Sequence, residues 1–171
     1  ISQKSLKHIW QREAMRVSHR QKLINKYLFL FGMGGILYVF IELLWRSWSH
    51  WTMFALGGLC FIYLGLINEV LRWDTPLWQQ VLIGAIGITA LEFVTGCVVN
   101  LRLGWGVWDY SGLPGNVWGQ ICPQYMALWP PISLAGIILD DWIRYRAFGE
   151  ERPRYNIGVT RYSKRIVWMP E

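Results

Sequence analysis

The chain contains four long runs of predominantly apolar residues, which we assign to residues 27–45, 51–71, 77–101 and 121–142. A helix rises about 1.5 Å per residue, so each run is long enough to cross the roughly 30 Å hydrocarbon core of a bilayer. Hydrocarbon offers no hydrogen-bond partners to the backbone, whereas an α-helix satisfies its own backbone groups. The sequence therefore predicts an all-α polytopic membrane protein, a bundle of four transmembrane helices.

Composition and tryptophan placement support this assignment. Apolar residues make up 53% of the chain and the mean hydropathy is +0.23, a combination that soluble domains seldom show because their surfaces need more charge. Tryptophan prefers the headgroup level of a bilayer. Several tryptophans stand near the ends of the apolar runs, namely Trp45, Trp48, Trp51, Trp73, Trp78 and Trp142.

The basic residues gather at the two ends of the chain. Residues 1–26 contain seven Lys and Arg, residues 143–171 contain seven more, and only three lie in residues 27–142. Basic segments next to membrane spans tend to stay on the cytoplasmic side. We therefore expect a transmembrane domain at 27–142, basic cytoplasmic tails at 1–26 and 143–171, and a place in the cell membrane with both termini in the cytoplasm.

The N-terminal tail carries a narrow apolar stripe. Leu6, Trp10, Ala14 and Val17 recur at intervals of four, four and three residues, which is the spacing of one helical face. The stripe predicts a basic amphipathic helix on the membrane surface, with anionic lipids bound at the basic tails. A merely solvated tail is an equal alternative because the apolar face is narrow.

Two carboxylates fall inside apolar runs at matching positions. Glu42 and Glu92 each lie 15 residues after the start of a span that runs outward, or roughly 22 Å along the helix. Two carboxylates brought together in a low dielectric do not both ionise, so the pair is a candidate site for a proton or a cation. In the structural alternative, Glu42 pairs with Arg46 one turn later. Glu92 would then accept hydrogen bonds from Thr89, Thr95 or another helix.

The predicted outer loop GWGVWDYSGLPGNVWGQIC is rich in tryptophan, tyrosine and glycine. Its aromatic content exceeds what a solvated loop needs, and its glycines and Pro114 permit tight turns, so we expect it to fold onto the bundle. Asp109 and Tyr110 would then reach the outer end of the helix bundle, near the two carboxylates. An Asx turn within the loop explains Asp109 nearly as well. Arg102, like Arg46, is a candidate counter-ion for these acids.

The fourth span contains Pro130 and Pro131 near its centre. Proline lacks an N–H donor, so carbonyls about one turn earlier lose their helical partners. Interrupted spans often line substrate sites in transporters because such carbonyls can coordinate cations. We therefore include Gln124 among the candidate ligands, since it is a polar group in the outer half of this broken helix. A simple kink packed by neighbouring helices is an equally good interpretation.

Acidic residues also stand near the predicted inner face. Glu69 lies three residues before Arg72, and Asp140 and Asp141 precede Arg144 at helical spacing. A DDxxD metal motif would require an acid at position 144. We therefore interpret these residues as local ion pairs at inner helix ends.

The sequence lacks the residue patterns that several kinds of chemistry require. The chain has no GxxxxGK[ST] phosphate loop, no HExxH and no GxSxG. Cys60, Cys97 and Cys122 form neither a zinc pattern nor a disulfide framework. No nucleic-acid-binding motif accompanies the basic tails. We expect no cofactor, no bound metal and no nucleic-acid partner, and we find no internal repeat in the sequence.

The segments LEFVTG (91–96), WDYSGLPGNVWGQIC (108–122) and the following LWP resemble the CmpB-like family of type IV ABC-transporter membrane proteins. The likeness covers most of residues 30–145 and implies a small multi-pass membrane protein related to transport. Glu42 fits a glutamate near the end of the family's first helix. The other positions that the resemblance highlights are Glu92, Thr95, Gly96, Trp108, Asp109, Tyr110 and Ser111.

These features favour a transport-related membrane subunit, or permease, that handles a small cation, a proton or a small solute through Glu42 and Glu92. Four short spans seldom enclose a pathway alone, so we expect a homo-oligomer or further membrane subunits. The alternative is a structural or assembly subunit of a larger membrane complex, without transport or catalysis of its own. A membrane-embedded enzyme comes third, because the sequence offers neither a nucleophile with a base nor a metal cluster.

Overall fold

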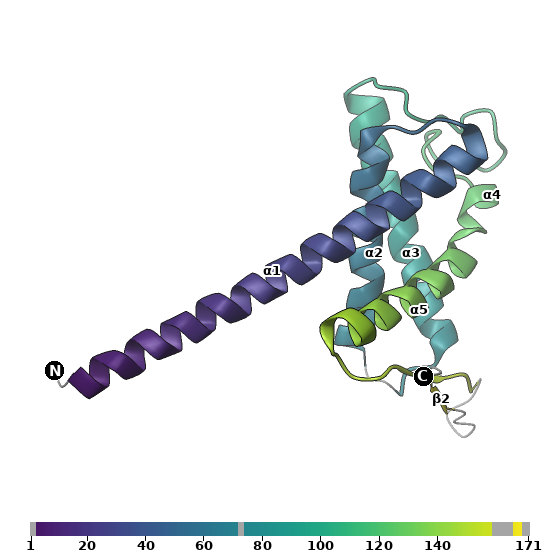
Figure 1. The fold of residues 1–171 in the computed structure, drawn as a ribbon. Helices are drawn as coiled ribbons and strands as arrows, with labels where there is room; N and C mark the ends of the chain where they lie inside the picture. The colour runs from purple at the N-terminus through teal and green to yellow at the C-terminus, as the bar shows by residue number, and fades with distance from the viewer. Residues whose placement is uncertain (1–2, 72–73, 159–165, 169–171) are drawn as a thin grey trace.

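The structure is a computed structural model that describes residues 3–71, 74–158 and 166–168. Its helices, in chain order (Figure 1), are α1 (Gln3–Arg46), α2 (Trp51–Val70), α3 (Leu77–Gly96), the π-helical segment η1 (Cys97–Arg102), α4 (Pro123–Met126) and α5 (Trp129–Phe148). They are followed by two short antiparallel strands, β1 (Arg154–Asn156) and β2 (Ile166–Trp168).

Four helical segments are long and apolar enough to cross a membrane. They are Arg20–Arg46, Trp51–Val70, Leu77–Arg102 and Pro123–Phe148. Each overlaps one of the four predicted runs, which confirms the all-α bundle of four membrane-spanning helices. The two short antiparallel strands β1 and β2 lie in the C-terminal tail and were not predicted.

The bundle has two distinct ends. The loop that joins η1 to α4, residues 103–122, covers one end, which we call the loop end, and β1 lies at the opposite end, which we call the tail end (Figure 1). Successive spans run in alternate directions between these ends. The residues Arg46, Arg102 and Pro123 therefore all lie at the loop end.

Helix α2 forms the centre of the bundle, packing against α1, α3 and α5. The main apolar core gathers around Leu56 and Leu64 of α2, Ile88 of α3, Val99 of η1 and Ile137 of α5. Lateral faces of the spans remain apolar and exposed, as helices facing lipid require. The core thus fixes α3 and α5 around α2, with α1 added on one side.

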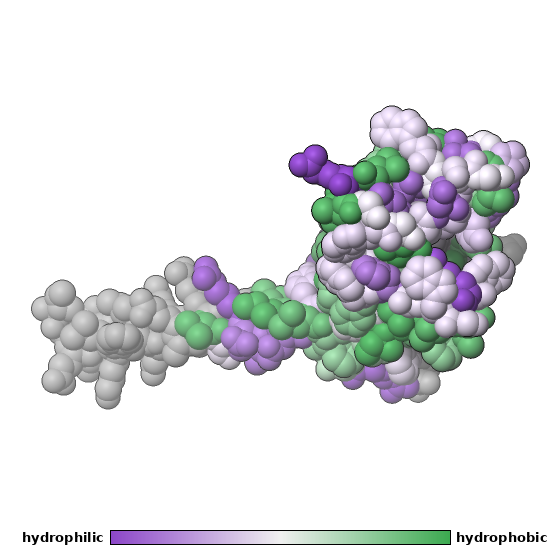
Figure 2. Space-filling model, turned by 90° about the horizontal axis from the view of Figure 1, so that it is seen from above, coloured by the Kyte–Doolittle hydropathy of each residue, from purple (hydrophilic) through white to green (hydrophobic). Residues whose placement is uncertain are grey.

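Helix α1 is a single helix of 44 residues. The basic segment 1–26 is therefore continuous with the first span, rather than a separate surface helix, over the residues that the structure describes. The apolar stripe lies mostly on side chains outside the described residues, and its contact with a membrane surface stays a prediction. A span of 27 residues is longer than the hydrocarbon core needs, so tilt is expected. Figure 1 shows α1 crossing α2 obliquely, and the space-filling view of Figure 2 shows an arm of the molecule projecting from the bundle.

Helices α1 and α2 cross at a pair of glycines. A Cβ atom added to Gly34 would lie 2.8 Å from the backbone oxygen of Gly57, and one added to Gly57 would lie 2.9 Å from that of Gly34. Phe31 and Phe54 meet edge to face beside the crossing, with ring centroids 5.8 Å apart. The missing side chains allow the two backbones to approach closely.

The segments on the two sides of this crossing have similar sequences. The segment LFGMGGILYVF (30–40) aligns with MFALGGLCFIY (53–63), so that the two glycine pairs coincide. Because α1 and α2 run in opposite directions, the contacts of the two glycine pairs are reciprocal. The expectation that the sequence has no internal repeat stays a prediction. Only three of the 11 aligned positions are identical, whereas the matching glycine contacts become evident in three dimensions.

The fourth span is interrupted, as predicted, but the break precedes the prolines. Helix α4 ends at Met126, and α5 begins at Trp129, with Pro130 and Pro131 in its first turn. Proline suits the start of a helix because the first N–H groups need no helical acceptor. The two prolines therefore begin α5 instead of kinking its middle.

Candidate functional site

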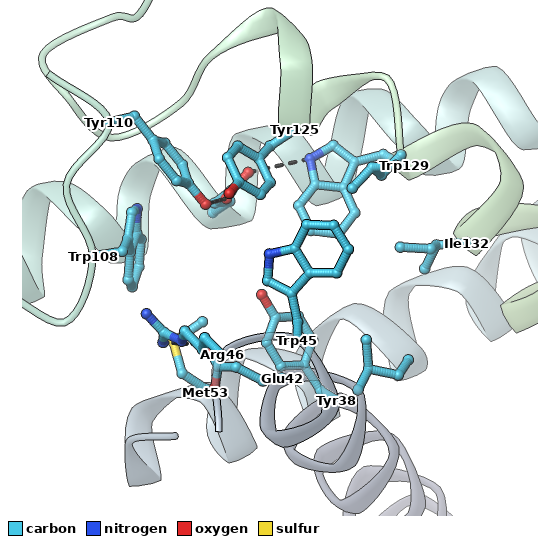
Figure 3. Close-up of a pocket in the computed structure, with 13 residues that line it drawn as sticks. Tyr38, Glu42, Trp45, Arg46, Met53, Trp108, Tyr110, Tyr125, Trp129 and Ile132 are labelled. Carbon is cyan, nitrogen blue, oxygen red and sulfur yellow. Dashed lines mark hydrogen bonds and ion pairs between the residues drawn. The ribbon is translucent and has the colours of Figure 1, made fainter. Parts of the chain in front are cut away.

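A cavity of about 200 Å³ opens between α1 and α5 beneath the loop end. At the tail end these helices touch, since the rings of Phe29 and Phe148 have centroids 5.8 Å apart. Nearer the loop end, residues of both helices line the cavity. Its walls are Tyr38, Ile41, Glu42, Trp45, Arg46, Met53, Glu92, Trp108, Tyr110, Tyr125, Leu128, Trp129 and Ile132 (Figure 3).

Glu92 is the buried carboxylate of this cavity, with an exposed fraction of only 3%. Trp129 donates from its indole Nε1 to Oε2 of Glu92 at 3.1 Å. The hydroxyl of Tyr110 donates to Oε1 at 3.3 Å. Both donors are neutral, and no ion pair of Glu92 occurs within the described residues. The carboxylate is thus oriented by hydrogen bonds but not neutralised by a basic side chain.

Tyr110 brings the loop into the cavity wall. Its ring stacks on that of Tyr125, with centroids 4.6 Å apart and an interplanar angle of 16°. Burial, followed by the nearby charge of Glu92, raises the pKa of the Tyr110 hydroxyl well above its ordinary value. The hydroxyl therefore stays protonated and available as a donor at physiological pH.

Glu42 has a different environment. It forms an ion pair with Arg46 one turn later and accepts a hydrogen bond from the Ser49 hydroxyl. Arg46 also donates to the carbonyl of Val107 at 2.9 Å and lies over the ring of Trp48 at 4.1 Å. Glu42 and Glu92 line the same cavity, but each carboxylate has its own partners. The pairing of Glu42 with Arg46 agrees with the structural alternative inferred from the sequence.

The loop is fixed to the bundle by polar contacts. The Asn100 side chain donates to Oε1 of Gln120 at 2.8 Å and accepts the backbone N–H of Val107 at 2.7 Å. The indole of Trp108 donates to the Gln120 carbonyl at 3.0 Å. These bonds account for how an aromatic loop rich in glycine closes over the cavity.

Three candidate residues lie outside the cavity wall. Asp109 is exposed and accepts hydrogen bonds from the backbone and hydroxyl of Ser111 at 2.8 and 2.9 Å, which is the Asx-turn alternative. Gln124 donates to the Pro114 carbonyl at 3.3 Å. Arg102 is exposed at the loop end. The structure thus brings Glu42, Glu92, Tyr110 and Arg46 together but leaves these three outside.

The sequence pattern did not place Tyr38, Trp45 or Trp129 in the cavity wall. Trp129 belongs to the LWP motif, and its position directly before two prolines marks the start of a helix. Tyr38 and Trp45 lie four residues before and three residues after Glu42, so they share its helical face. This spacing could have identified them as neighbours of the carboxylate.

A second polar cluster lies at the tail end. Arg144 donates to the fully buried Asp140 and to Glu69. Lys26 bridges Glu69 and Glu150 through Nζ distances of 3.3 and 2.7 Å. The predicted pairing of Asp140 with Arg144 is present. Glu69 instead reaches across the bundle to α1 and α5, while the predicted partner at position 72 lies outside the described residues.

Asp141 borders a cavity of about 420 Å³ in the same cluster. It accepts a hydrogen bond from the Asn68 amide at 2.6 Å and one from the Tyr155 hydroxyl at 2.8 Å. Burial and the neighbouring Asp141 charge raise the pKa of Tyr155 well above its ordinary value, so this donor also stays protonated. The bond from Tyr155 attaches β1 to α5.

The fold and the cavity define a four-span membrane protein with a buried carboxylate facing an aromatic cavity near the loop end of the bundle. Residues 8–148 match the sequence model of the family described as "Putative ABC-transporter type IV", and the chain belongs to this family. This confirms the resemblance seen in the loop and third-span motifs. No curated protein and no solved structure matches the chain.

Proposed function

We propose that this protein is the membrane subunit of a transporter and binds a cation or a proton at Glu92. The observation that carries the proposal is the environment of Glu92. Its carboxylate is almost completely buried and borders a cavity, and among the described residues it receives hydrogen bonds only from the neutral groups of Trp129 and Tyr110.

The energetics of burial explain why such a site calls for a positive charge. An ionised carboxylate removed from water without a cationic partner is costly, so it either takes up a proton or recruits a cation. Acidic residues within membrane spans often mark ion or proton pathways. Two oriented donors leave Glu92 accessible from the cavity side, where either species would arrive.

Glu42 serves a different role in this proposal. Its ion pair with Arg46 neutralises both charges locally. Because Arg46 also binds the Val107 carbonyl, the pair ties the end of α1 to the loop above the cavity. We therefore assign Glu42 and Arg46 to positioning the cavity wall, and Glu92 to binding.

Orientation and assembly complete the proposal. The basic tails favour cytoplasmic termini, which places the loop end and its cavity on the outer side of the cell membrane. The other three spans pack around α2, and four short spans seldom enclose a pathway alone. A second copy or another membrane subunit would therefore complete the pathway.

The test is cation-coupled flux in proteoliposomes, using the full chain with any subunits that co-purify. The substitution Glu92→Gln keeps the size of the side chain and removes its charge, so flux of protons or small cations should fall to background. Asp109→Asn is the matched control, because it makes the same chemical change in an exposed residue outside the cavity. Equal flux in wild type and Glu92→Gln would exclude the proposed role.

The structural or assembly alternative draws support from the tail-end cluster. Arg144, Asp140, Glu69 and Lys26 join α1, α2 and α5 through buried and partly buried ion pairs that need no ligand. Under this alternative Glu92 would likewise only hold α5 against α3. Glu92→Gln would then lower thermal stability or release a partner subunit, and co-purification in mild detergent would show that loss.

A further inference from the structure

The lining of the cavity indicates which kind of cation it suits. We infer that the ligand is an organic ammonium ion with methyl or similar apolar substituents, bound beside Glu92 and against aromatic rings. This inference rests on the proposed cation site and names its substrate class. It follows from the aromatic wall, the small number of oxygen ligands and the size and opening of the cavity.

Aromatic rings dominate the wall. They come from four separate parts of the chain, α1, the loop, α4 and the start of α5, and surround the cavity in Figure 3. The face of an aromatic ring carries negative electrostatic potential and attracts cations, most strongly when the site excludes water. Several rings around one carboxylate therefore form a cage suited to an alkylated ammonium.

The same wall is poorly suited to a metal ion. Calcium requires six or more oxygen ligands, and magnesium retains several waters in an octahedral shell. Glu92 is the one carboxylate of the described cavity wall that is not already paired with a basic residue. No group of three His, Cys, Asp or Glu side chains suited to a metal ion occurs among the described residues.

The size of the cavity limits the ligand. Its volume of about 200 Å³ lies below the roughly 300 Å³ at which pockets for drug-sized molecules begin. A proton alone would need no such space. A small ammonium with a few methyl groups would fill it while placing its charge near Glu92.

The cavity also borders the lipid-facing side of the bundle. Ile41 and Trp45 contribute to its wall and are 53% and 73% exposed on the side of α1. Their exposure would allow a ligand to enter the cavity from the lipid between α1 and α5, as well as from water. The same ammonium chemistry could thus come from a free solute or from a lipid headgroup.

The first experiment measures binding of radiolabelled choline to the full-length protein in a maltoside detergent, which carries no ammonium group. Unlabelled tetramethylammonium should compete. The uncharged carbon analogue 3,3-dimethyl-1-butanol should compete at least about tenfold more weakly, because it has the shape of choline without its charge. Equal competition by the neutral analogue, or no saturable choline binding, would overturn the inference.

A pair of variants locates the binding. Trp45→Leu removes a ring from the wall without removing any hydrogen bond to Glu92, and should weaken choline binding about threefold to tenfold. Trp142→Leu makes the same change in an exposed tryptophan outside the cavity wall and should leave binding unchanged. Equal effects of the two substitutions would contradict the aromatic cage.

The outcomes separate this inference from the proposed function. Flux of protons or sodium that depends on Glu92, without any choline binding, would overturn the ammonium class and leave the cation site standing. The absence of both Glu92-dependent flux and choline binding would overturn the ammonium inference and the proposed cation site together. Adding phosphatidylcholine to phosphatidylglycerol bilayers distinguishes the sources. Phosphatidylcholine would displace labelled choline if the site accepts a lipid headgroup, and would leave it bound if the site accepts only a free solute.

Discussion

The indole Nε1 of Trp129 donates a 3.1 Å hydrogen bond to Oε2 of Glu92, joining the first turn of α5 to the C-terminal part of α3. Pro130 and Pro131 place Trp129 at this point by starting the helix directly after a short break. The interrupted span thus supplies a side-chain donor to the buried carboxylate. Its role in orienting Glu92 leads to the first prediction.

Replacing Trp129 by Phe should lower the free energy of unfolding by about 1–2 kcal/mol. The ring remains, but a hydrogen bond to a buried carboxylate is lost and the acceptor is left partly unsatisfied. Tyr110→Phe should lower the free energy of unfolding by less, because the bond from Tyr110 to Glu92 is longer, at 3.3 Å, and the stacking on Tyr125 is kept. Thermal unfolding in detergent measures both. A larger loss for Tyr110→Phe would contradict the assigned order of the two donors.

The glycine crossing of α1 and α2 predicts a contrast between two glycines of the same helix. Gly34→Ala should destabilise the protein by about 2 kcal/mol or more, because the new Cβ would meet the Gly57 backbone oxygen at 2.8 Å. Gly32→Ala is the control, since nothing lies within 4 Å of a Cβ there and alanine favours a helix. Similar melting temperatures for the two variants would argue against a close crossing.

The tail-end cluster predicts a large effect of Arg144. Arg144→Met would leave the fully buried Asp140 without its cation, a loss that typically costs about 3–5 kcal/mol. Arg146→Met changes an exposed residue two positions later and should alter stability by less than about 0.5 kcal/mol. Chemical denaturation of both variants tests this. Equal stability of the two would show that Asp140 does not depend on Arg144.

Cytoplasmic termini predict a defined labelling pattern on intact cells. Gly112→Cys lies in the exposed loop, with nothing within 4 Å of its Cβ, and should react with a membrane-impermeant maleimide from outside. Ser18→Cys, exposed on the basic segment of α1, should react only after permeabilisation. The reverse pattern would invert the proposed orientation.

The sequence predicted the spans well because the hydrocarbon core imposes both length and apolar composition on a membrane helix. The pairing of Glu42 with Arg46 was equally accessible, because residues four apart lie on one helical face. Asp109 forms the Asx turn that the sequence analysis kept as an alternative, because this turn needs only neighbouring residues. Local geometry is thus readable from residue spacing.

Contacts between distant segments were not readable in this way. Trp129 and Glu92 are separated by 37 residues, and Arg144 and Glu69 by 75. Their meeting depends on how α5 starts and how it packs against α2 and α3. The aromatic cavity depends in addition on how α1 and α5 lie relative to each other, which no periodicity in the sequence encodes.

The central claim is that Glu92 binds a cation in the cavity, and site-specific carbodiimide labelling tests it most directly. A hydrophobic carbodiimide modifies carboxyl groups in apolar surroundings, and mass spectrometry of the peptide that contains Glu92 measures the yield. Saturating tetramethylammonium should protect Glu92 severalfold, while the labelling of Asp109, which lies outside the cavity wall, stays unchanged. Labelling of Glu92 that no tested cation, organic or inorganic, alters would contradict the account.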